Sequence, residues 1–449
     1  MIVSVLQGLP PDWVTSLQES VSHVPSGGFC KNSKLASLDK RLGDLIMKKT
    51  LAAVAVLGAF AGSALAADVQ LYGLVDTGFQ YLSADVDRNG FDSENKFSME
   101  SGMQSGSRFG IKGTEDLGNG LTVGFILENQ FKSDSGALEN EDSFFHREAS
   151  LFLQGGFGKV AFGRMGSING GTSSWGKYGV ISAFGTSWGN YAAQAGTFAI
   201  GGGQWDNMIS YETPSFAGFK VFAQYGMGNT VSEDETVTVT GPDGNYDVTV
   251  EHVYGTENES DSDRYYAIGA SYANGPLNLY FAVDSTNYSS VHYTGVPYDQ
   301  DDSLTVTLGG NYDFEVVKLF AGAQYFDEVK LSKMKGAVNY SAAANQGLAS
   351  RMKGFGVGLS ASIPVAGGNV LVGAAYLDAE AADSVDTTKE NDELTRWIVS
   401  AGYDYPFSKR TNVYGVLTYN QDSLDYTAEA TKDNDPTVFG VMIGLRHKF

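Results

Sequence analysis

The stretch 437–449 alternates between two kinds of side chain. One parity holds the large apolar residues Phe439, Val441, Ile443, Leu445 and Phe449. The other parity is glycine-rich and ends in charge, and it consists of Gly440, Met442, Gly444, Arg446 and Lys448. A period of two is that of a β-strand whose two faces meet different surroundings. Because an edge strand with so apolar a face would aggregate in water, it needs pairing on both sides and an apolar medium outside. The stretch therefore predicts the closing strand of a transmembrane β-barrel.

The composition agrees with a membrane protein made of strands. The 449 residues include 56 Gly, 24 Tyr and only 10 Pro, and 52 acidic residues outnumber 30 basic ones. Such a chain is too regular in pattern for disorder and too polar for a bundle of membrane helices.

The N-terminal part contains the one long apolar run, from Leu51 to Ala67. It follows Met47 and two lysines and ends in the small-x-small sequence Ala64-Leu65-Ala66. A basic start, an apolar middle and such an end are typical of a secretory signal peptide. We expect residues 47–66 to be this signal peptide and the barrel to comprise residues 67–449, an exported chain.

Residues 1–46 match no periodic template. We interpret them as translated upstream sequence, with Met47 as the start, because a signal peptide normally begins at its own Met. The alternative is a genuine N-terminal extension. Cys30 falls in this segment, so residues 67–449 contain no cysteine and cannot hold a disulfide or a cysteine metal site.

Strand-like segments after residue 67 alternate between two kinds of connection. The short connections are rich in Gly, Pro, Asn and Asp, as tight turns require, and they are 114–120, 155–158, 214–218, 273–276, 313–315, 363–368 and 405–410. The long ones are polar and mostly acidic, and they are 83–105, 133–146, 165–205, 227–263, 287–302, 329–351, 378–393 and 422–436. Seven short and eight long connections join sixteen strands. An even number of strands with short periplasmic turns and long external loops predicts an all-β, antiparallel outer-membrane barrel.

Several segments carry a resemblance to a known family. Residues 107–121, 147–164 and 206–214, together with the opening 71–76 and the terminal Phe449, resemble the general porins of Gram-negative outer membranes, particularly those of β-proteobacterial type. The likeness extends over nearly all of residues 68–449.

The resemblance implies a homotrimer of sixteen-stranded barrels, surrounded by lipopolysaccharide, that admits small hydrophilic solutes and carries no cofactor. It also implies that the third long loop folds into the lumen, where acidic residues of the loop face basic residues of the wall. Phe449 would then be recognised by the barrel-assembly machinery.

Candidate pore-lining residues follow from strand parity and from this likeness. Arg108 and Lys112 share a parity opposite Phe109 and Ile111, which directs both into the lumen. Arg108 and Arg147 occupy positions that resemble the family's wall arginines. The full candidate set is Arg108, Lys112, Arg147, Glu128, Asp76 and Asp206. We expect the basic members to bias ion passage, since charged rings set channel selectivity. The alternative is that they only solvate a wide lumen or pair with Glu128 and Asp76.

The third long loop departs from the family pattern. Residues 165–205 contain no Asp or Glu, and Lys177 is their only charged residue. Asp206 is the nearest carboxylate that could substitute. The loop is instead aromatic, with Trp175, Tyr178, Trp188, Tyr191 and Trp205. These rings could form a stacking surface for sugars, or they could fix the loop to the barrel wall, which is the interpretation that we favour.

Charge predicts two opposite selectivities. Acidic external loops attract cations at long range, an effect that weakens with salt. A basic, carboxylate-poor constriction favours anions, and charges in a narrow pore are less screened than those of the external loops. We therefore expect anion preference or low selectivity.

One segment does not fit a lipid-facing strand. Whichever parity of residues 147–154 contains Arg147, the other contains Glu148, Ser150 and Gln154. Such a strand would make sense if its outer face met another protomer.

Other chemistry finds little support in the sequence. Acidic clusters such as 233–235, 299–302 and 378–393 could hold divalent cations that bridge lipopolysaccharide. We interpret them as solvated loop surfaces, because none has the spacing of a calcium loop. We recognise no catalytic arrangement and no phosphate or dinucleotide motif, and we expect neither enzymatic activity nor nucleic-acid binding. The sequence thus predicts a passive diffusion channel. The alternatives are a sugar-specific porin and a barrel with an adhesive or structural role.

Overall fold

The computed structural model describes residues 67–85, 94–185, 188, 194–199, 203–228, 231–241, 244–254, 257–258, 262–288, 301–331, 348–383, 389–427 and 435–449. The predicted upstream segment 1–46 and signal peptide 47–66 lie outside these residues. None of the helices in the described part is long and apolar enough to cross a membrane.

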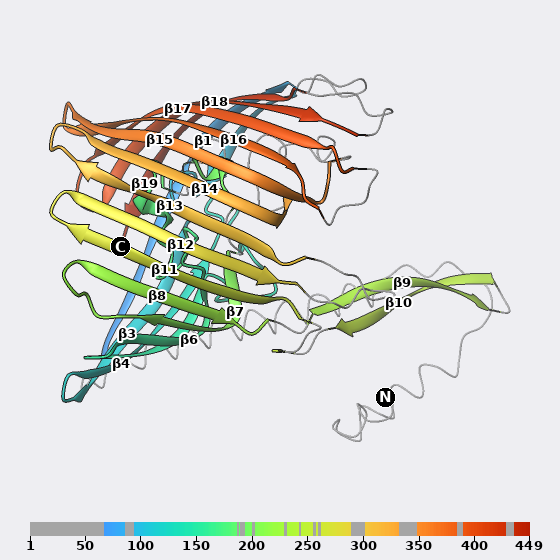
Figure 1. Cartoon of the computed structure of the whole chain (residues 1–449), viewed down its shortest axis with the longest axis horizontal. Helices are drawn as coiled ribbons and strands as arrows, with labels where there is room; N and C mark the ends of the chain where they lie inside the picture. The colour runs from blue at the N-terminus through green and yellow to red at the C-terminus, as the bar shows by residue number, and fades with distance from the viewer. Residues whose placement is uncertain are drawn as a thin grey trace. The chain divides into compact units, whose positions relative to one another are not determined.

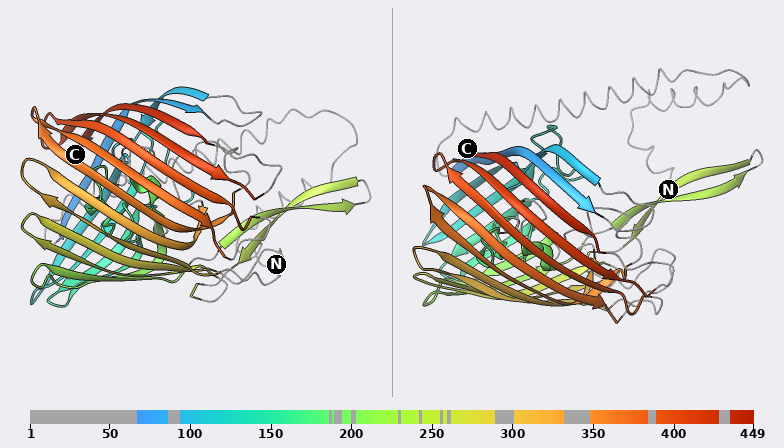
Figure 2. Two further views of the ribbon diagram at one scale, coloured as in Figure 1. Left: turned by 45° about the horizontal axis from the view of Figure 1, so that its top comes forward. Right: turned by 90° about the horizontal axis from the view of Figure 1, so that it is seen from above.

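Sixteen strands among the described residues close into one antiparallel barrel (Figure 1). In chain order they are β1 (Ala67–Asp85), β3 (Arg108–Gly118), β4 (Leu121–Gln130), β5 (Glu148–Gly155), β6 (Gly158–Gly166), β7 (Gln204–Glu212), β8 (Phe219–Gly226), β11 (Arg264–Asn274), β12 (Leu277–Asn287), β13 (Ser303–Asp313), β14 (Lys318–Lys330), β15 (Arg351–Val365), β16 (Gly368–Ala381), β17 (Glu393–Pro406), β18 (Thr411–Asp425) and β19 (Thr437–Lys448). Figure 2 shows these strands inclined side by side around the barrel. The predicted fold class is confirmed.

Three further strands lie in segments that the sequence analysis treated as irregular loops. β2 (Glu94–Ser101) pairs with residues 77–84 of β1, and β3 pairs with residues 67–74 of the same strand. β2 and β3 therefore share one position beside β1, interrupted at residues 102–107. β9 (Val231–Gly241) and β10 (Gly244–Tyr254) pair only with each other, as a two-stranded sheet.

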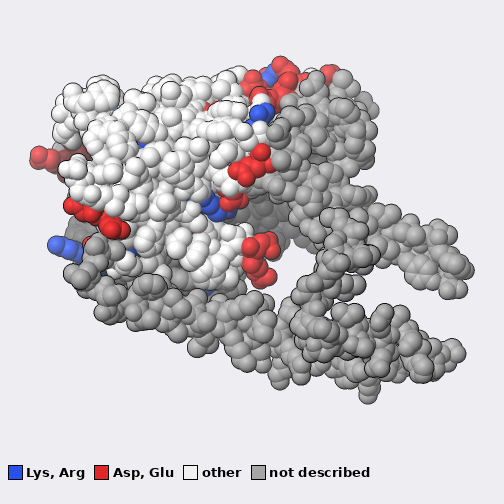
Figure 3. Space-filling model, turned by 90° about the horizontal axis from the view of Figure 1, so that it is seen from below, with Lys and Arg blue, Asp and Glu red and all other residues white. Residues whose placement is uncertain are grey.

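The alternation of the terminal strand is confirmed. Phe439, Ile443 and Leu445 are exposed on the outside of β19, whereas Val438 and Met442 are buried on the inside. Other strands place large apolar side chains outward in the same way, and Figure 3 shows a barrel surface that is mostly uncharged between charged groups at its two ends. A charge at mid-bilayer on this surface would cost about 2–4 kcal/mol. The outer surface therefore suits lipid.

The two ends of the barrel sequence close it. β1 pairs with β19 from Leu74↔Lys448 to Asp85↔Thr437. Beyond this ladder, Phe449 N donates to Gly73 O at 3.0 Å and Gly73 N donates to Phe449 O at 3.2 Å. A Cβ at position 73 would lie 2.5 Å from the Phe449 ring, so only glycine leaves room for that ring.

The interpretation of residues 147–154 was wrong in one respect. β5 begins at Glu148, and Arg147 precedes it, so Arg147 does not share the alternation of the strand. Glu148 and Ser150 are buried on the inside, while Leu151 is exposed on the outside. The outer face of β5 is therefore apolar, and it gives no evidence of its own for a partner protomer.

Candidate functional site

Two arginines lie on the inner wall around a single carboxylate. Arg147 Nε donates to Glu128 Oε1 at 2.6 Å, and Arg108 Nε lies 3.6 Å from Glu128 Oε2. Arg147 also donates to Gln130, and Tyr72 OH donates to Glu128 Oε2 at 3.0 Å. Two cations thus share Glu128, and a second buried carboxylate, Glu148, lies directly across from Glu128 on β5.

The other predicted pore-lining residues lie apart from this pair. Lys112 is exposed on the inner face, with Nζ 5.1 Å from the centre of the Tyr72 ring. Asp206 pairs with Arg164 of β6 at 2.6 Å, so its carboxylate does not stand opposite the wall arginines. Asp76 is completely buried, and its prediction as a residue that lines the open pore was wrong.

Asp76 is buried because the segment that joins β2 to β3 folds over it. Its carboxylate accepts hydrogen bonds from the backbone N–H groups of Gln104 and Ser105, at 2.9 and 2.7 Å. The hydroxyl of Tyr414 donates to the same carboxylate at 2.5 Å. Asp76 therefore holds the 102–107 segment to the wall.

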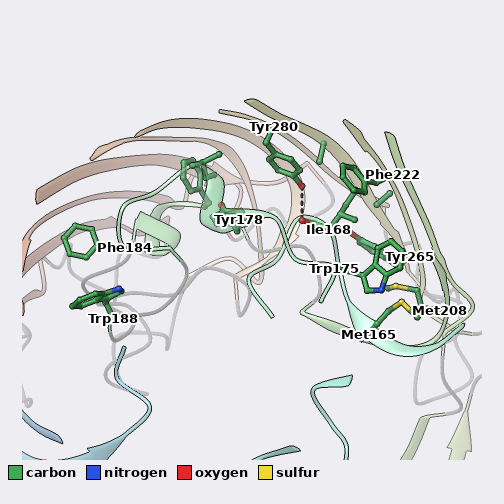
Figure 4. Close-up of a cluster of buried hydrophobic side chains, with 14 of the residues drawn as sticks. Met165, Ile168, Trp175, Tyr178, Phe184, Trp188, Met208, Phe222, Tyr265 and Tyr280 are labelled. Carbon is green, nitrogen blue, oxygen red and sulfur yellow. Dashed lines mark hydrogen bonds between the residues drawn. The ribbon is translucent and has the colours of Figure 1, made fainter. Parts of the chain in front are cut away.

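The third long loop lies along the inside of the barrel, as Figure 4 shows. Inner-wall side chains bond to its backbone at successive strands. Tyr280 OH of β12 donates to Ile168 O at 3.0 Å, and Asn311 Nδ2 of β13 donates to Val180 O at 2.8 Å.

The hydrogen bonds continue towards the tip of the loop and along its return. Ala183 N donates to Ser360 Oγ of β15 at 2.9 Å, and Ala199 N donates to Gln324 Oε1 of β14 at 2.6 Å. The described part of the loop is therefore attached to the wall on its way out and on its way back.

The predicted loop aromatics are mostly buried against this wall. Trp175, Tyr178 and Trp188 are at most 7% exposed, and Trp205 is half-buried, with its ring stacked 5.2 Å from that of Tyr265. Tyr191 lies outside the described residues. The Trp188 ring lies 5.3 Å from the Tyr414 ring, edge to face. Buried rings hold the loop by packing, and their faces are closed to a sugar.

The comparisons with known proteins agree with this architecture. A family model described as Gram-negative porin matches residues 52–425. The chain belongs to the Gram-negative porin family. An outer membrane porin protein of Bordetella pertussis is 33% identical, with 90% of this chain and 100% of that protein covered. Outer membrane porin protein 32 of Delftia acidovorans is 30% identical at the same coverage.

A solved structure extends the likeness to three dimensions. The anion-selective porin from Comamonas acidovorans superposes with a TM-score of 0.56 at 27% identity, and the match covers 85% of this chain and 100% of that one. The protein is therefore an outer-membrane porin, a channel for passive diffusion of solutes.

Glycines in the wall of the porin provide the space for its third loop. Gly309, Gly322, Gly356, Gly373 and Gly402 all lie on the inner face of β13 to β17. A Cβ at position 309 would lie 2.7 Å from the side chain of Ile181, and one at position 356 would lie 1.9 Å from Thr197 O. We call the inner faces of β8 and β11 to β17, which carry the loop, the loop wall.

A buried ion pair supports the return of the loop. Arg396 is completely buried and donates from Nε and Nη2 to the two oxygens of Asp422, at 2.7 and 2.8 Å. Its Nη1 donates to Gly196 O at 2.7 Å. Because Asp422 accepts both bonds, Arg396 acts on the loop as a fixed hydrogen-bond donor rather than as a free cation.

The one charged residue of the loop lies beside a wall carboxylate. Lys177 Nζ lies 3.8 Å from Glu212 Oε2 and 4.9 Å from the centre of the Phe222 ring. Burial lowers the pKa of Lys177 from its ordinary value, and the charge of Glu212 opposes this effect.

Sequence reasoning missed Arg446 as a member of the site. This residue lies on the inner face of β19, and its side chain is half-buried. Its lumen parity in the terminal strand was the available signal. We call the inner faces of β3 to β5 and β19, together with Arg147 just before β5, the basic wall; its cations are Arg108, Lys112, Arg147 and Arg446.

Proposed function

We propose that this porin is a general diffusion channel that prefers small anions. The carrying observation is the charge of the basic wall, where four cations outnumber the buried carboxylates Glu128 and Glu148 and residues 165–205 of the third loop add no carboxylate. Charges that line a narrow pore act on ions at close range. The name of the structurally similar Comamonas porin, which is anion-selective, supports the same proposal.

The reversal potential in a salt gradient tests this preference. The channel is reconstituted in a planar bilayer with unequal KCl on the two sides. We expect the reversal potential to have the sign of a chloride-preferring pore. This sign should be retained at high salt, because the pore charges are less screened than those of the external loops. A strong potassium preference would contradict the proposal.

We further propose that the porin is a homotrimer whose contact includes the outer faces of β5 to β8. These strands have 8, 9, 9 and 8 residues, whereas β15 to β18 have 15, 14, 14 and 15. At a tilt of about 45°, eight residues rise only about 19 Å, less than the apolar band of about 25 Å. A protein partner relieves this mismatch. If the current of one inserted channel closes in three equal steps, a trimer is supported. Closure in a single step throughout would count against it.

The remaining partners follow from the location in the outer membrane. We propose that lipopolysaccharide surrounds the outer leaflet end of the barrel and that Phe449 is presented to the barrel-assembly machinery. The bonds of Phe449 to Gly73 support recognition before closure, since both backbone groups are occupied once β1 and β19 have paired.

A sugar-specific porin is the weaker candidate. Ring stacking of sugars needs open aromatic faces, and the described loop aromatics are packed against the wall. Neutral sugars should therefore leave the single-channel current unchanged, apart from their effect on viscosity.

A further inference from the structure

Arg446 is held on the lumen face of β19 by neutral groups. Its Nε donates to Asn412 Oδ1 and its Nη1 donates to Ser105 Oγ, each at 2.9 Å. Neutral acceptors orient the guanidinium without cancelling its charge. The side chain is only half-buried, so part of the group remains open to the lumen.

The carboxylates around Arg446 are bonded to neutral donors instead. Asp76 accepts from Tyr414 and from two backbone N–H groups of the 102–107 segment. Asp404 accepts from Asn412 Nδ2 at 2.6 Å and from a side-chain amide at 3.3 Å. Within the described part of the chain, no carboxylate forms a salt bridge with Arg446. Asp76 lies opposite Arg446 across β1 and β19 and attracts it without a direct ion pair, so the charge of Arg446 is offset only in part.

Other cations reinforce the field at this place. Lys448 follows on the same face of β19, and it and Arg108 of β3 pair with Leu74 of β1 from its two sides. In the same ladder Arg446 pairs with Asp76, two residues further along β1. Arg108 shares Glu128 with Arg147. The four cations thus form a continuous series along the basic wall.

The series extends along the pore. Arg108 is the first residue of β3 (Arg108–Gly118), whose other end leads into a short turn. Arg446 lies near the end of β19 (Thr437–Lys448), at the side of the barrel where the short turns lie. Arg446 is therefore closer to the short-turn opening, which faces the periplasm in barrels of this kind.

We propose that Arg446, assisted by Lys448, is a second anion-binding site between the Arg108–Arg147 pair and the periplasmic opening. Its ligands are small inorganic anions such as chloride and phosphate. Two weak sites in series favour conduction, because an ion that enters one site promotes departure from the next. The inference rests on the proposed anion preference.

Block of the chloride current by inorganic phosphate tests this second site. Phosphate is added to one side of the bilayer and then to the other, for the wild type and for Arg446→Gln. We expect the half-blocking concentration to rise several fold in Arg446→Gln from one side only, the side nearer the short turns. Arg446→Lys, which keeps the charge, should retain most of the block.

Arg410→Gln is the matched control, because Arg410 is an exposed turn residue at the same end of the barrel. It should leave the block unchanged. If Arg446→Gln does not fold, Lys448→Gln should show a smaller, one-sided loss. Equal effects of Arg446→Gln and Arg410→Gln, or an equal loss from both sides, would overturn the second site. The wild-type reversal potential decides the anion preference separately, since it does not depend on either variant.

Discussion

The loop wall and the basic wall face the same lumen and use their inner residues in opposite ways. On the loop wall, glycines and neutral side chains accommodate the third loop, and donors such as Asn311 and Tyr280 bond to its backbone. On the basic wall, Arg108 and Arg446 have part of their charge directed to the lumen. The loop wall serves attachment, whereas the basic wall presents charge to ions and holds the loop at Glu148, which accepts from Ser174 N and Oγ at 2.8 Å.

This difference shows that the third loop supplies no acidic residues to face the cations of the basic wall. The resemblance implied acidic loop residues across from basic wall residues, and residues 165–205 contain none. Asp206, the expected substitute, is paired with Arg164. Glu128 and Glu148 are buried in the wall beside the cations, and residues 165–205 add no carboxylate, so the field should favour anions rather than orient dipoles across the pore.

The largest expected effect is a loss of stability on removing Arg396, which supports the loop from the loop wall. Arg396→Met leaves Asp422 buried without its partner and removes the donor to Gly196 O, so we expect a loss of about 3–5 kcal/mol in the free energy of unfolding. The control is Lys353→Met, whose ion pairs with Glu380 and Asp383 are largely exposed, and which should change stability by at most about 1 kcal/mol. Urea unfolding of the barrel in detergent measures both. Equal shifts would refute the structural role of Arg396.

A substitution at one of the inner-face glycines that contact the third loop should move the loop. In Gly356→Ala the new Cβ would lie 1.9 Å from Thr197 O, so the loop must shift towards the lumen. We expect a loss of stability of about 1–3 kcal/mol together with a lower unit conductance. Gly415→Ala is the control, since its Cβ meets only an ordinary contact at 3.6 Å from Met442 O. Wild-type conductance in Gly356→Ala would show that the position of the loop does not depend on the space left by Gly356.

Changes on the basic wall should alter selectivity in opposite directions. Glu128→Gln removes the shared carboxylate and should raise the preference for chloride, while Arg147→Gln should lower it. Each should cost about 1–3 kcal/mol of stability, because each breaks the buried charge-assisted hydrogen bond between Arg147 and Glu128. Reversal potentials measure the two shifts. Shifts of the same sign would mean that packing rather than charge sets the selectivity.

The smallest expected effect is a pH dependence at Lys177. Its pKa is lowered by burial in the folded porin, so between the folded and unfolded pKa values the unfolded chain binds more protons. Stability should therefore rise with pH through this interval, below the ordinary lysine pKa. Lys177→Met should remove that slope, and urea midpoints measured at several pH values would detect it. An unchanged slope in Lys177→Met would assign the effect to another group.

The sequence predicted the features that alternation against lipid imposes. The inward and outward residues of β19 were correct because lipid and lumen demand different side chains at adjacent positions. β9 and β10 were missed because their sheet is separate from the barrel and follows no such demand. Arg147 was misjudged because it precedes β5 and escapes the alternation.

The attachment of the loop could not be predicted from the loop itself. Wall side chains such as Asn311 and Ser360 bond to its backbone, and a backbone group leaves no mark on the sequence. The signal was in the wall, where Gly309 and Gly322 occupy lumen positions of neighbouring strands. Asp76 was likewise misassigned, because its lumen parity does not reveal that residues 102–107 cover it.

A disulfide between loop and wall tests most directly whether the conducting porin keeps its third loop attached. Residues 67–449 contain no cysteine, and Ala183 N lies 2.9 Å from Ser360 Oγ, so Ala183→Cys with Ser360→Cys provides a single pair at this contact. Single-channel currents are compared before and after oxidation and again after reduction. The account predicts that the oxidised channel keeps the unit conductance and the reversal potential of the reduced one. Loss of conductance on oxidation, restored by reduction, would mean that the open channel needs a detached loop and would contradict it.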